Sequence, residues 1–192
     1  MTLLEFLSGK SRESALNWAM PQAHRLTLPS ASVKQQIASK AEWNESRSSQ
    51  QADFFTFGYS GRKTEELLAV LKEHGVRTVI DVRQNPVSIY RPELSKTNFA
   101  QLLLEQGMCY AHLRELGVPR DIRAKAIETG SRDVIWTWYD SNVVACFLNL
   151  HSFLNGFEHP VALMCSEIDP HECHRHRLSL ALEAMGLNGF DL

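Results

Sequence analysis

Short apolar runs alternate with amphipathic segments from residue 53 to the end of the chain. Apolar runs of this length, ended by polar residues or glycine, indicate buried strands. The predicted strands cover residues 54–57, 76–82, 108–113 and 161–164. The predicted helices cover residues 64–74, 95–106, 134–155 and 170–185, and a polar, arginine-rich loop is expected from 114 to 132. These strand-then-helix units predict an α/β fold, a small four-stranded parallel sheet with helices on both faces. The strand orders 2-1-3-4 and 3-2-1-4 satisfy the right-handed crossover rule equally well.

Residues 1–52 differ in character from the rest of the chain. The stretch from 30 to 52 is rich in Ser, Gln, Ala and Lys with few large apolar residues, which is typical of a linker or a marginal helix. Residues 1–20 contain two short apolar helical faces that could dock on the core, contact a partner or pair two copies of the chain. The sequence therefore predicts an N-terminal extension over 1–52, partly helical or disordered, and an α/β domain over 53–192.

Composition narrows the class of protein. The net charge of −2 excludes a protein-wide basic field of the kind that coats nucleic acid. No apolar run is long enough to span a bilayer, and the start of the chain lacks the pattern of a secretory signal. The four cysteines (Cys109, Cys146, Cys165 and Cys173) lack the spacing of a disulfide framework. A cytoplasmic protein with no membrane partner is expected.

Polar and charged side chains follow each predicted strand. The ends of parallel strands share one edge of a sheet, and ligands bind in the crevice there. The residues expected to bind a ligand at this edge are Gly58, Tyr59, Ser60, Arg62, Arg83, His112, His174 and Arg175. The forked arginine side chain matches phosphate or carboxylate groups, so an anionic small molecule or nucleic acid is the expected partner. Glycines 58 and 61 would allow the backbone to approach an anion closely.

The densest chemistry lies between residues 165 and 175. Asp169 is placed to cap a helix whose first residue is Pro170, which puts the second cysteine, His174 and Arg175 in or just after the first turn. Exposed N–H groups there favour a thiolate or a bound phosphate. The catalytic candidates are Glu167, Cys165, Cys173 and Asp81. Glu167 is expected to act as general acid or base, a cysteine as nucleophile or pocket wall, and Asp81 as the group that orients Arg83 or His174.

The segments at these strand ends resemble the domain-of-unknown-function family 488. The matching segments are Gly58-Tyr59-Ser60, Asp81-Val82-Arg83, Tyr110-Ala111-His112-Leu113, Glu115-Leu116-Gly117, Cys165-Ser166-Glu167 and Cys173-His174-Arg175. The resemblance covers about residues 53–187 and implies a compact α/β domain, without implying an activity. A weaker likeness to rhodanese-type sulfurtransferases rests on Asp-Val-Arg after an early strand and a cysteine after a later one. It would imply sulfur transfer at Cys165, but here Asp169 and Pro170 delay the helix that cradles the cysteine in that family.

Three functional interpretations remain open. The first is an enzyme that acts on a phosphate-bearing nucleotide or nucleic acid with its own side chains and no favoured cofactor. The second is a metal-dependent hydrolase in which Cys165, Cys173 and His174 bind zinc or iron. The possible fourth ligands of that site are His112, His171 and His176. Against it, Cys173 and His174 would point about 100° apart if both were helical. The third is a non-catalytic module that stacks bases on Tyr59, Tyr90 and Tyr110.

Overall fold

A five-stranded parallel sheet forms the centre of the protein in the computed structural model, which describes residues 48–146 and 154–192. The expectations for residues 1–47 lie outside the described residues. The strands are β1 (Phe54–Gly58), β2 (Thr78–Asp81), β3 (Cys109–His112), β4 (Val161–Cys165) and β5 (Gly189–Asp191). Their order in the sheet is β3-β2-β4-β1-β5, and every pairing is parallel.

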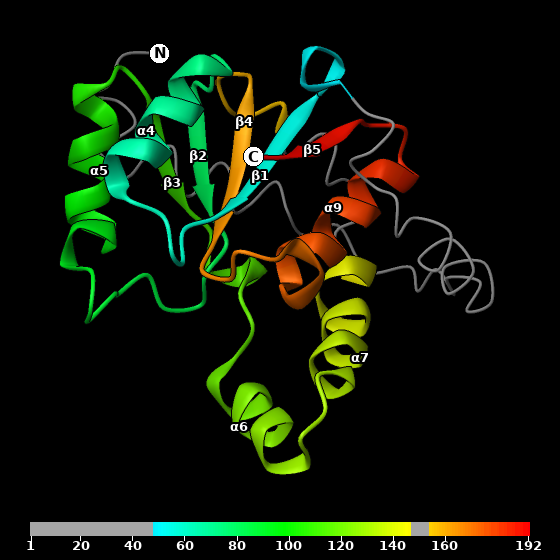
Figure 1. The fold of residues 1–192 in the computed structure, drawn as a ribbon. Coiled ribbons are helices and arrows are strands. Elements are labelled where there is room, and N and C mark those ends of the chain that lie inside the picture. Colours follow the sequence, from blue (N-terminus) through cyan, green and yellow to red (C-terminus); the bar gives the residue numbers. More distant parts are fainter. Residues whose placement is uncertain (1–47, 147–153) are drawn as a thin grey trace.

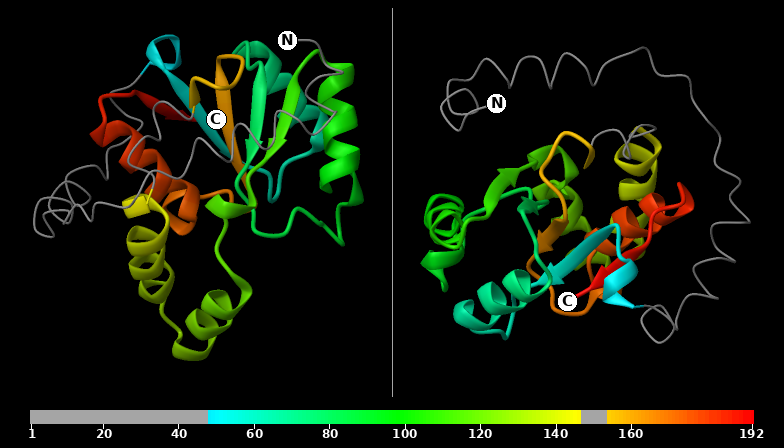
Figure 2. Two further views of the ribbon diagram at one scale, coloured as in Figure 1. Left: turned by 180° about the vertical axis from the view of Figure 1, so that it is seen from behind. Right: turned by 90° about the horizontal axis from the view of Figure 1, so that it is seen from above.

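Two layers of helices cover the sheet, and the two core clusters identify which helices lie on which face (Figures 1 and 2). The helices are α4 (Thr64–Glu73), α5 (Lys96–Glu105), α6 (Arg120–Thr129), α7 (Asp133–Asn142) and α9 (His174–Ala184). Helices α4 and α5 bury Leu67, Leu71, Phe99 and Leu103 against one face. Helices α7 and α9 bury Tyr139, Leu178 and Leu182 against the other. Helix α6 pairs with α7 as a hairpin that projects from the carboxyl edge of the sheet (Figure 1).

The α/β class, the parallel sheet and its four predicted strands are confirmed, but the strand count and both suggested orders are wrong. The fifth strand, β5, is only three residues long and pairs beside β1. Strand β4 lies between β1 and β2, which neither suggested order allows. All five of its residues are buried, so the most apolar strand takes the centre and the partly exposed β3 takes an edge.

One loop prediction and two helix predictions also need correction. The expected loop after β3 contains a short 3₁₀ turn (Arg114–Leu116) and then α6, which Gly130 ends in the left-handed conformation. The expected helix over 134–155 is interrupted: α7 ends at Asn142 and a 3₁₀ turn (Val144–Cys146) follows, while residues 147–153 of the expected helix lie outside the described residues. The expected helix over 170–185 is two elements, a 3₁₀ turn (Pro170–Glu172) and then α9. The break between those two elements lies at Cys173, inside the densest part of the candidate site.

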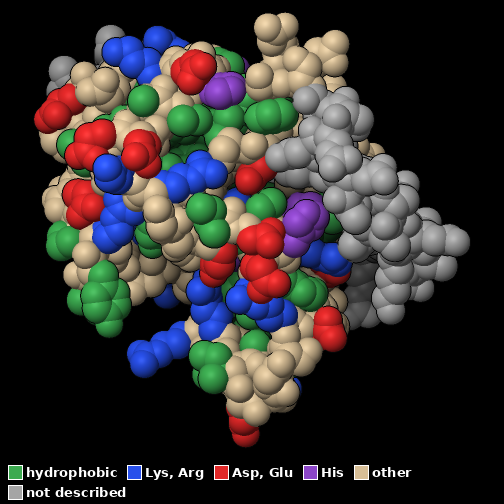
Figure 3. All heavy atoms as spheres, viewed as in Figure 1, with side chains coloured by type: hydrophobic (Ala, Val, Ile, Leu, Met, Phe, Trp, Pro, Cys, Tyr) green, Lys and Arg blue, Asp and Glu red, His purple; other side chains and the backbone are tan. Residues whose placement is uncertain are grey.

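Acidic and basic side chains are interspersed on the face shown in Figure 3. Among the described helices, none combines the length and hydrophobicity needed to cross a membrane.

Candidate functional site

The chain between β4 and α9 brings two cysteines together. Cys165 is the last residue of β4, and Cys173 sits in an extended conformation (φ −122°, ψ 141°) directly before α9. The intervening 3₁₀ turn is capped by Asp169, whose carboxylate accepts the His171 N–H at 2.9 Å. Because Cys173 precedes the helix, the expected 100° separation from His174 does not apply. Its sulfur accepts the Arg175 N–H at 3.5 Å and so caps the helix.

Four donor side chains converge at the carboxyl end of β4. Glu167 Oε2 lies 3.2 Å from Cys165 Sγ and 3.1 Å from Cys173 Sγ. His174 Nδ1 lies 3.8 Å from Cys165 Sγ and 4.0 Å from Cys173 Sγ. All four ligand atoms lie within 4.8 Å of one another. These residues (Cys165, Glu167, Cys173 and His174) are called the four-donor cluster below.

The imidazole of His174 is oriented by the backbone. Its Nε2 lies 3.0 Å from the Val82 carbonyl oxygen at the exit of β2. A carbonyl only accepts hydrogen bonds, so Nε2 carries the proton and donates it. In the neutral ring, Nδ1 then keeps a lone pair that can bind a proton or a metal. Cys165 Sγ lies almost equally far from Nδ1, at 3.8 Å, and from Nε2, at 3.9 Å. The ring of Tyr139 packs against the imidazole with 5.3 Å between centroids.

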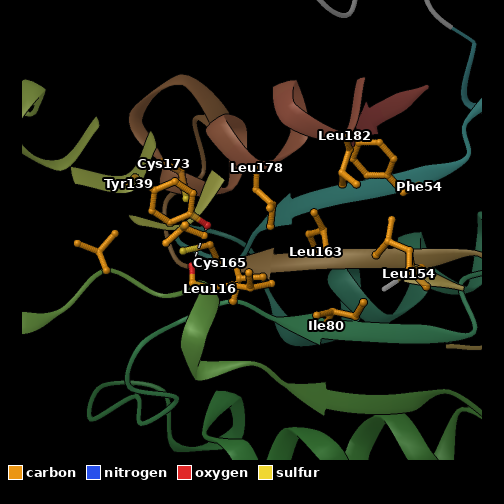
Figure 4. Packing of buried hydrophobic residues seen from close by; sticks show 14 residues of the cluster. Phe54, Ile80, Leu116, Tyr139, Leu154, Leu163, Cys165, Cys173, Leu178 and Leu182 are labelled. Carbon is orange, nitrogen blue, oxygen red and sulfur yellow. Dashed lines mark hydrogen bonds between the residues drawn. The ribbon is translucent and has the colours of Figure 1, made fainter. Parts of the chain in front are cut away.

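The cluster is buried on the α7–α9 side of the sheet, close to Tyr139 and Leu116 (Figure 4). The two cysteines and His174 are at most 3% exposed, whereas Glu167 is partly exposed. Glu167 is therefore the donor through which solvent reaches the cluster.

Burial and mutual contact shift the protonation of these groups. Burial alone would raise the pKa of the Cys165 thiol, but the Cys173 thiol and the His174 imidazolium lower it. Burial and the negative charge of Cys165 raise the pKa of Cys173 well above its usual value. Burial opposes the charged form of His174, but the Cys165 charge raises its pKa. The pKa of Glu167 falls to about 2, because hydrogen bonds from the backbone and the thiols outweigh its burial. Of the two thiols, Cys165 is therefore the one that ionises more readily.

The geometry of the cluster fits a metal ion. Donor atoms around a tetrahedral zinc, with Zn–S about 2.3 Å and Zn–N about 2.0 Å, lie roughly 3.5–3.8 Å apart. Four of the six donor separations run from 3.1 to 4.0 Å, and all six are within 4.8 Å. Thiolate and imidazole are the ligands that zinc prefers, and the hydrogen bond from Nε2 to a carbonyl is the usual support of a metal-binding histidine.

Arg83 lies beside this cluster, in a network at the end of β2. Its Nε lies 2.8 and 3.0 Å from the two carboxylate oxygens of Asp81, and the contact from Nη2 to Asp81 Oδ2 is 2.5 Å. Its remaining contacts are to the Tyr59 hydroxyl at 3.1 Å and the Leu94 carbonyl at 3.0 Å. Tyr110 donates to the same carboxylate at 2.6 Å. Each of the three guanidinium nitrogens of Arg83 therefore already donates to a group of the protein.

Arg175 is used internally in the same way. Its guanidinium donates to the Glu167 carbonyl, to the Ile168 carbonyl at 2.9 Å and to Asp191 at 3.2 Å. The side chain is fully buried, and Asp191 of β5 supplies its countercharge. Arg175 thus clamps the backbone of the loop that carries Glu167.

The other predicted ligand-binding residues lie around these networks. Gly58 is paired with Cys165, and its backbone packs against Glu167: a Cβ there would lie 1.7 Å from the Glu167 carbonyl oxygen. Ser60 donates its N–H to the Ser166 carbonyl at 2.9 Å. His112 Nε2 lies 2.8 Å from the Arg83 carbonyl oxygen. Arg62 is partly exposed in the loop after β1.

Three contributors are absent from the site residues predicted from the sequence: the Val82 carbonyl, Asp191 and Tyr139. A backbone acceptor leaves no side-chain signature, and Asp191 belongs to the strand that was not foreseen. Tyr139 is fully buried, and its aromatic character alone did not distinguish core packing from contact with His174.

The family described as domain of unknown function DUF488 matches residues 63–182. The chain belongs to this family. The matched stretch includes Asp81 and Arg83 together with the whole four-donor cluster, whereas the Gly58-Tyr59-Ser60 turn lies just before it. Comparison with curated proteins and with solved structures gives no match. The predicted resemblance to this family is therefore confirmed. The family description assigns no activity to the site.

Proposed function

We propose that this DUF488 chain is a zinc-dependent hydrolase whose centre is the four-donor cluster. Cys165, Cys173 and His174 bind the ion, and Glu167 acts as general base. One observation carries the proposal: two sulfurs, a carboxylate oxygen and an imidazole nitrogen converge within 4.8 Å of one another in a buried site. Two cysteines and a histidine are a known catalytic zinc set, which leaves a fourth position open.

Each residue has a distinct task in this proposal. A zinc ion bound here supplies a Lewis acid and brings the pKa of water toward about 7. Glu167, the one partly exposed donor, accepts the proton of the attacking water and passes it to the leaving group. A glutamate that is not required as a ligand plays this part beside the two-cysteine, one-histidine zinc of nucleobase deaminases. Arg175 holds the Glu167 backbone and keeps its carboxylate facing the sulfurs.

The proposed substrate bears a phosphate or another anionic group. Arg83 and Arg175 are engaged inside the protein, so this role passes to basic side chains near the same sheet edge. Arg62 is partly exposed, and Arg114 and Arg120 are exposed. These side chains retain the geometry that suits a phosphate.

The decisive experiment is elemental analysis of the full chain, purified without an affinity tag or chelator. About one zinc per chain is expected in the wild type, as a single site of this donor set requires. Cys173→Ser should lose the metal, whereas Cys109→Ser, which alters an exposed cysteine outside the cluster, should keep it. A wild-type chain that takes up no zinc even on reconstitution would overturn the proposal.

Hydrolysis is then tested with two chromogenic probes, bis(4-nitrophenyl) phosphate and 4-nitrophenyl acetate. Glu167→Gln is expected to keep zinc bound through the other three ligands and to lose turnover by 10²-fold or more, on the order of a lost general base. Zinc that is lost together with Glu167 would instead identify a closed, structural site.

A second candidate is a thiol enzyme that works without metal on the same class of anionic substrate. The contact of 3.8 Å between Cys165 Sγ and His174 Nδ1 favours it, with the pKa of the thiol lowered and that of the imidazole raised, since such a pairing activates a cysteine nucleophile. A metal-free protein that iodoacetamide inactivates at Cys165 would support this candidate. A non-catalytic nucleic-acid module would instead show salt-sensitive oligonucleotide binding that survives Glu167→Gln.

A further inference from the structure

One peptide unit connects the end of β2 to the four-donor cluster. Its N–H belongs to Arg83 and donates to Asp81 Oδ1 at 3.0 Å. Its carbonyl belongs to Val82 and accepts from His174 Nε2 at 3.0 Å. The peptide group is planar and trans, so its N–H and C=O point in opposite directions. Holding the N–H toward Asp81 therefore aims the carbonyl at His174.

Asp81 is itself held firmly. The Arg83 guanidinium pairs with both of its carboxylate oxygens, and the Tyr110 hydroxyl donates to Oδ2 at 2.6 Å. Asp81 is fully buried and Arg83 is 4% exposed, so solvent does not compete for these contacts. Further bonds fix the neighbouring backbone: the Val82 N–H donates to the Met164 carbonyl at 3.0 Å, and the Arg83 carbonyl lies 2.8 Å from His112 Nε2.

We infer that Asp81 and Arg83 are positioning residues for the metal ligand His174, an inference that rests on the proposed zinc centre. Asp81 sets the peptide, the Val82 carbonyl takes the Nε2 proton, and Nδ1 is left to bind the metal. Such a hydrogen bond fixes the tautomer of a metal-binding imidazole and raises its basicity. Arg83 supplies the countercharge of the buried Asp81 side chain.

This inference gives the Asp81-Val82-Arg83 segment a role other than phosphate binding. It also connects two segments 92 residues apart, Val82 and His174, through one hydrogen bond. Both segments lie in the stretch that the DUF488 family matches.

The test measures zinc affinity by competition with a chromophoric chelator, on full chains whose folding is checked by circular dichroism. Asp81→Ala removes the acceptor of the Arg83 N–H and is expected to weaken zinc binding by about 10–100-fold, as for other supporting residues of metal ligands. Asp81→Asn keeps an oxygen that can accept this N–H, and should recover part of the loss. The control is Asp140→Asn, which removes the negative charge beside Arg177, a residue of the same helix as His174, and should leave zinc affinity unchanged.

Nitrogen-15 NMR of labelled histidine reports the tautomer of the His174 imidazole, which a loss of stability alone would not change. The His174 signal, assigned from a His174→Gln variant, should show the Nε2–H tautomer in the wild type and a mixture in Asp81→Ala. Should Asp81→Ala fail to fold, Asp81→Asn and Arg83→Lys are measured in its place, and weaker zinc binding than Asp140→Asn is expected of both. Zinc binding as tight as that of Asp140→Asn, with the wild-type tautomer, would overturn the inference and leave the zinc centre standing. A wild type that binds no zinc would remove the centre and this inference with it.

Discussion

Two glycines near the end of β1 are required for different physical reasons. Gly58 is the last residue of β1 and Gly61 lies in the loop that follows, and the sequence suggested that both let the backbone approach an anion. At Gly58 the space is already filled, because the Glu167 carbonyl group and the Ile168 Cα lie where a side chain would begin. Gly61 faces open space but has a φ of +76°. The first glycine is required by packing and the second by backbone conformation.

Replacing the two glycines by alanine should separate these demands. Gly58→Ala should cost at least about 3 kcal/mol, since the clash is with backbone that Arg175 clamps in place. Gly61→Ala should cost about 1–2 kcal/mol, the strain of a left-handed alanine. Urea denaturation measures both, and the Gly58 variant should also lose zinc because Glu167 and the cysteine loop must move. Equal losses of stability in the two variants would contradict this account.

At the scale of single side chains, the sequence predicted which residues carry the chemistry, but it did not predict which groups those residues contact. Cys165, Glu167, Cys173 and His174 were recognised because reactive side chains crowd one strand exit. The sequence could not reveal that Arg83 is engaged internally, because that depends on Asp81, Tyr59 and the Leu94 carbonyl meeting in space.

Elements were predictable in proportion to their apolar content. Strands β1 to β4 carry buried residues that make the runs visible, whereas β5 is three residues long and leaves no pattern. Helix α6 was expected as a loop because it buries only Ala126 among charged neighbours. The break at Cys173 was hidden because Asp169 and Pro170 are good helix-start residues, and here they begin a 3₁₀ turn instead.

The contact between α7 and the sheet edge provides a prediction at this scale. Tyr139 is fully buried, packs on His174 and donates its hydroxyl to the Leu116 carbonyl at 2.8 Å. Tyr139→Phe keeps the ring contact but leaves that buried carbonyl without its donor, so the free energy of unfolding should fall by about 1–3 kcal/mol. Zinc content should not change. Tyr90→Phe is the control, since Tyr90 is 96% exposed and its change should stay within about 0.5 kcal/mol. Loss of zinc from Tyr139→Phe would show that the hydroxyl supports the metal site directly.

For the whole molecule, the strand order decides where the site can form. Placing β4 between β1 and β2 brings Cys165 beside Gly58 on one side and sets Met164 against Asp81 on the other. The exits of three strands thus meet around one cluster with β4 in the middle, whereas both suggested orders placed β4 at an edge of the sheet. Sequence pattern could not supply this, because the order depends on which strand can be buried on both sides.

A metal at this junction would cross-link β4 to α9 and should stabilise the entire α/β domain. At a free zinc concentration 100-fold above Kd, binding adds about 2.7 kcal/mol to the free energy of unfolding. For a chain of this size that corresponds to a rise in Tm of about 5–10 °C. Adding a chelator should remove the rise in the wild type and in Cys109→Ser, and should have no effect on Cys173→Ser, which has no site to empty.

The same rise in Tm should shrink as the pH falls. Zinc binds the two thiolates and the neutral imidazole, so protons compete with it, and acid favours the metal-free state. The Tm values measured with and without chelator should therefore approach each other as the pH is lowered from about 8 to about 5, because protons displace zinc from its ligands. A gap that is independent of pH would mean that the stabilising ion is held by other groups. No gap at any pH in a zinc-loaded protein would mean that the cluster does not couple metal binding to folding.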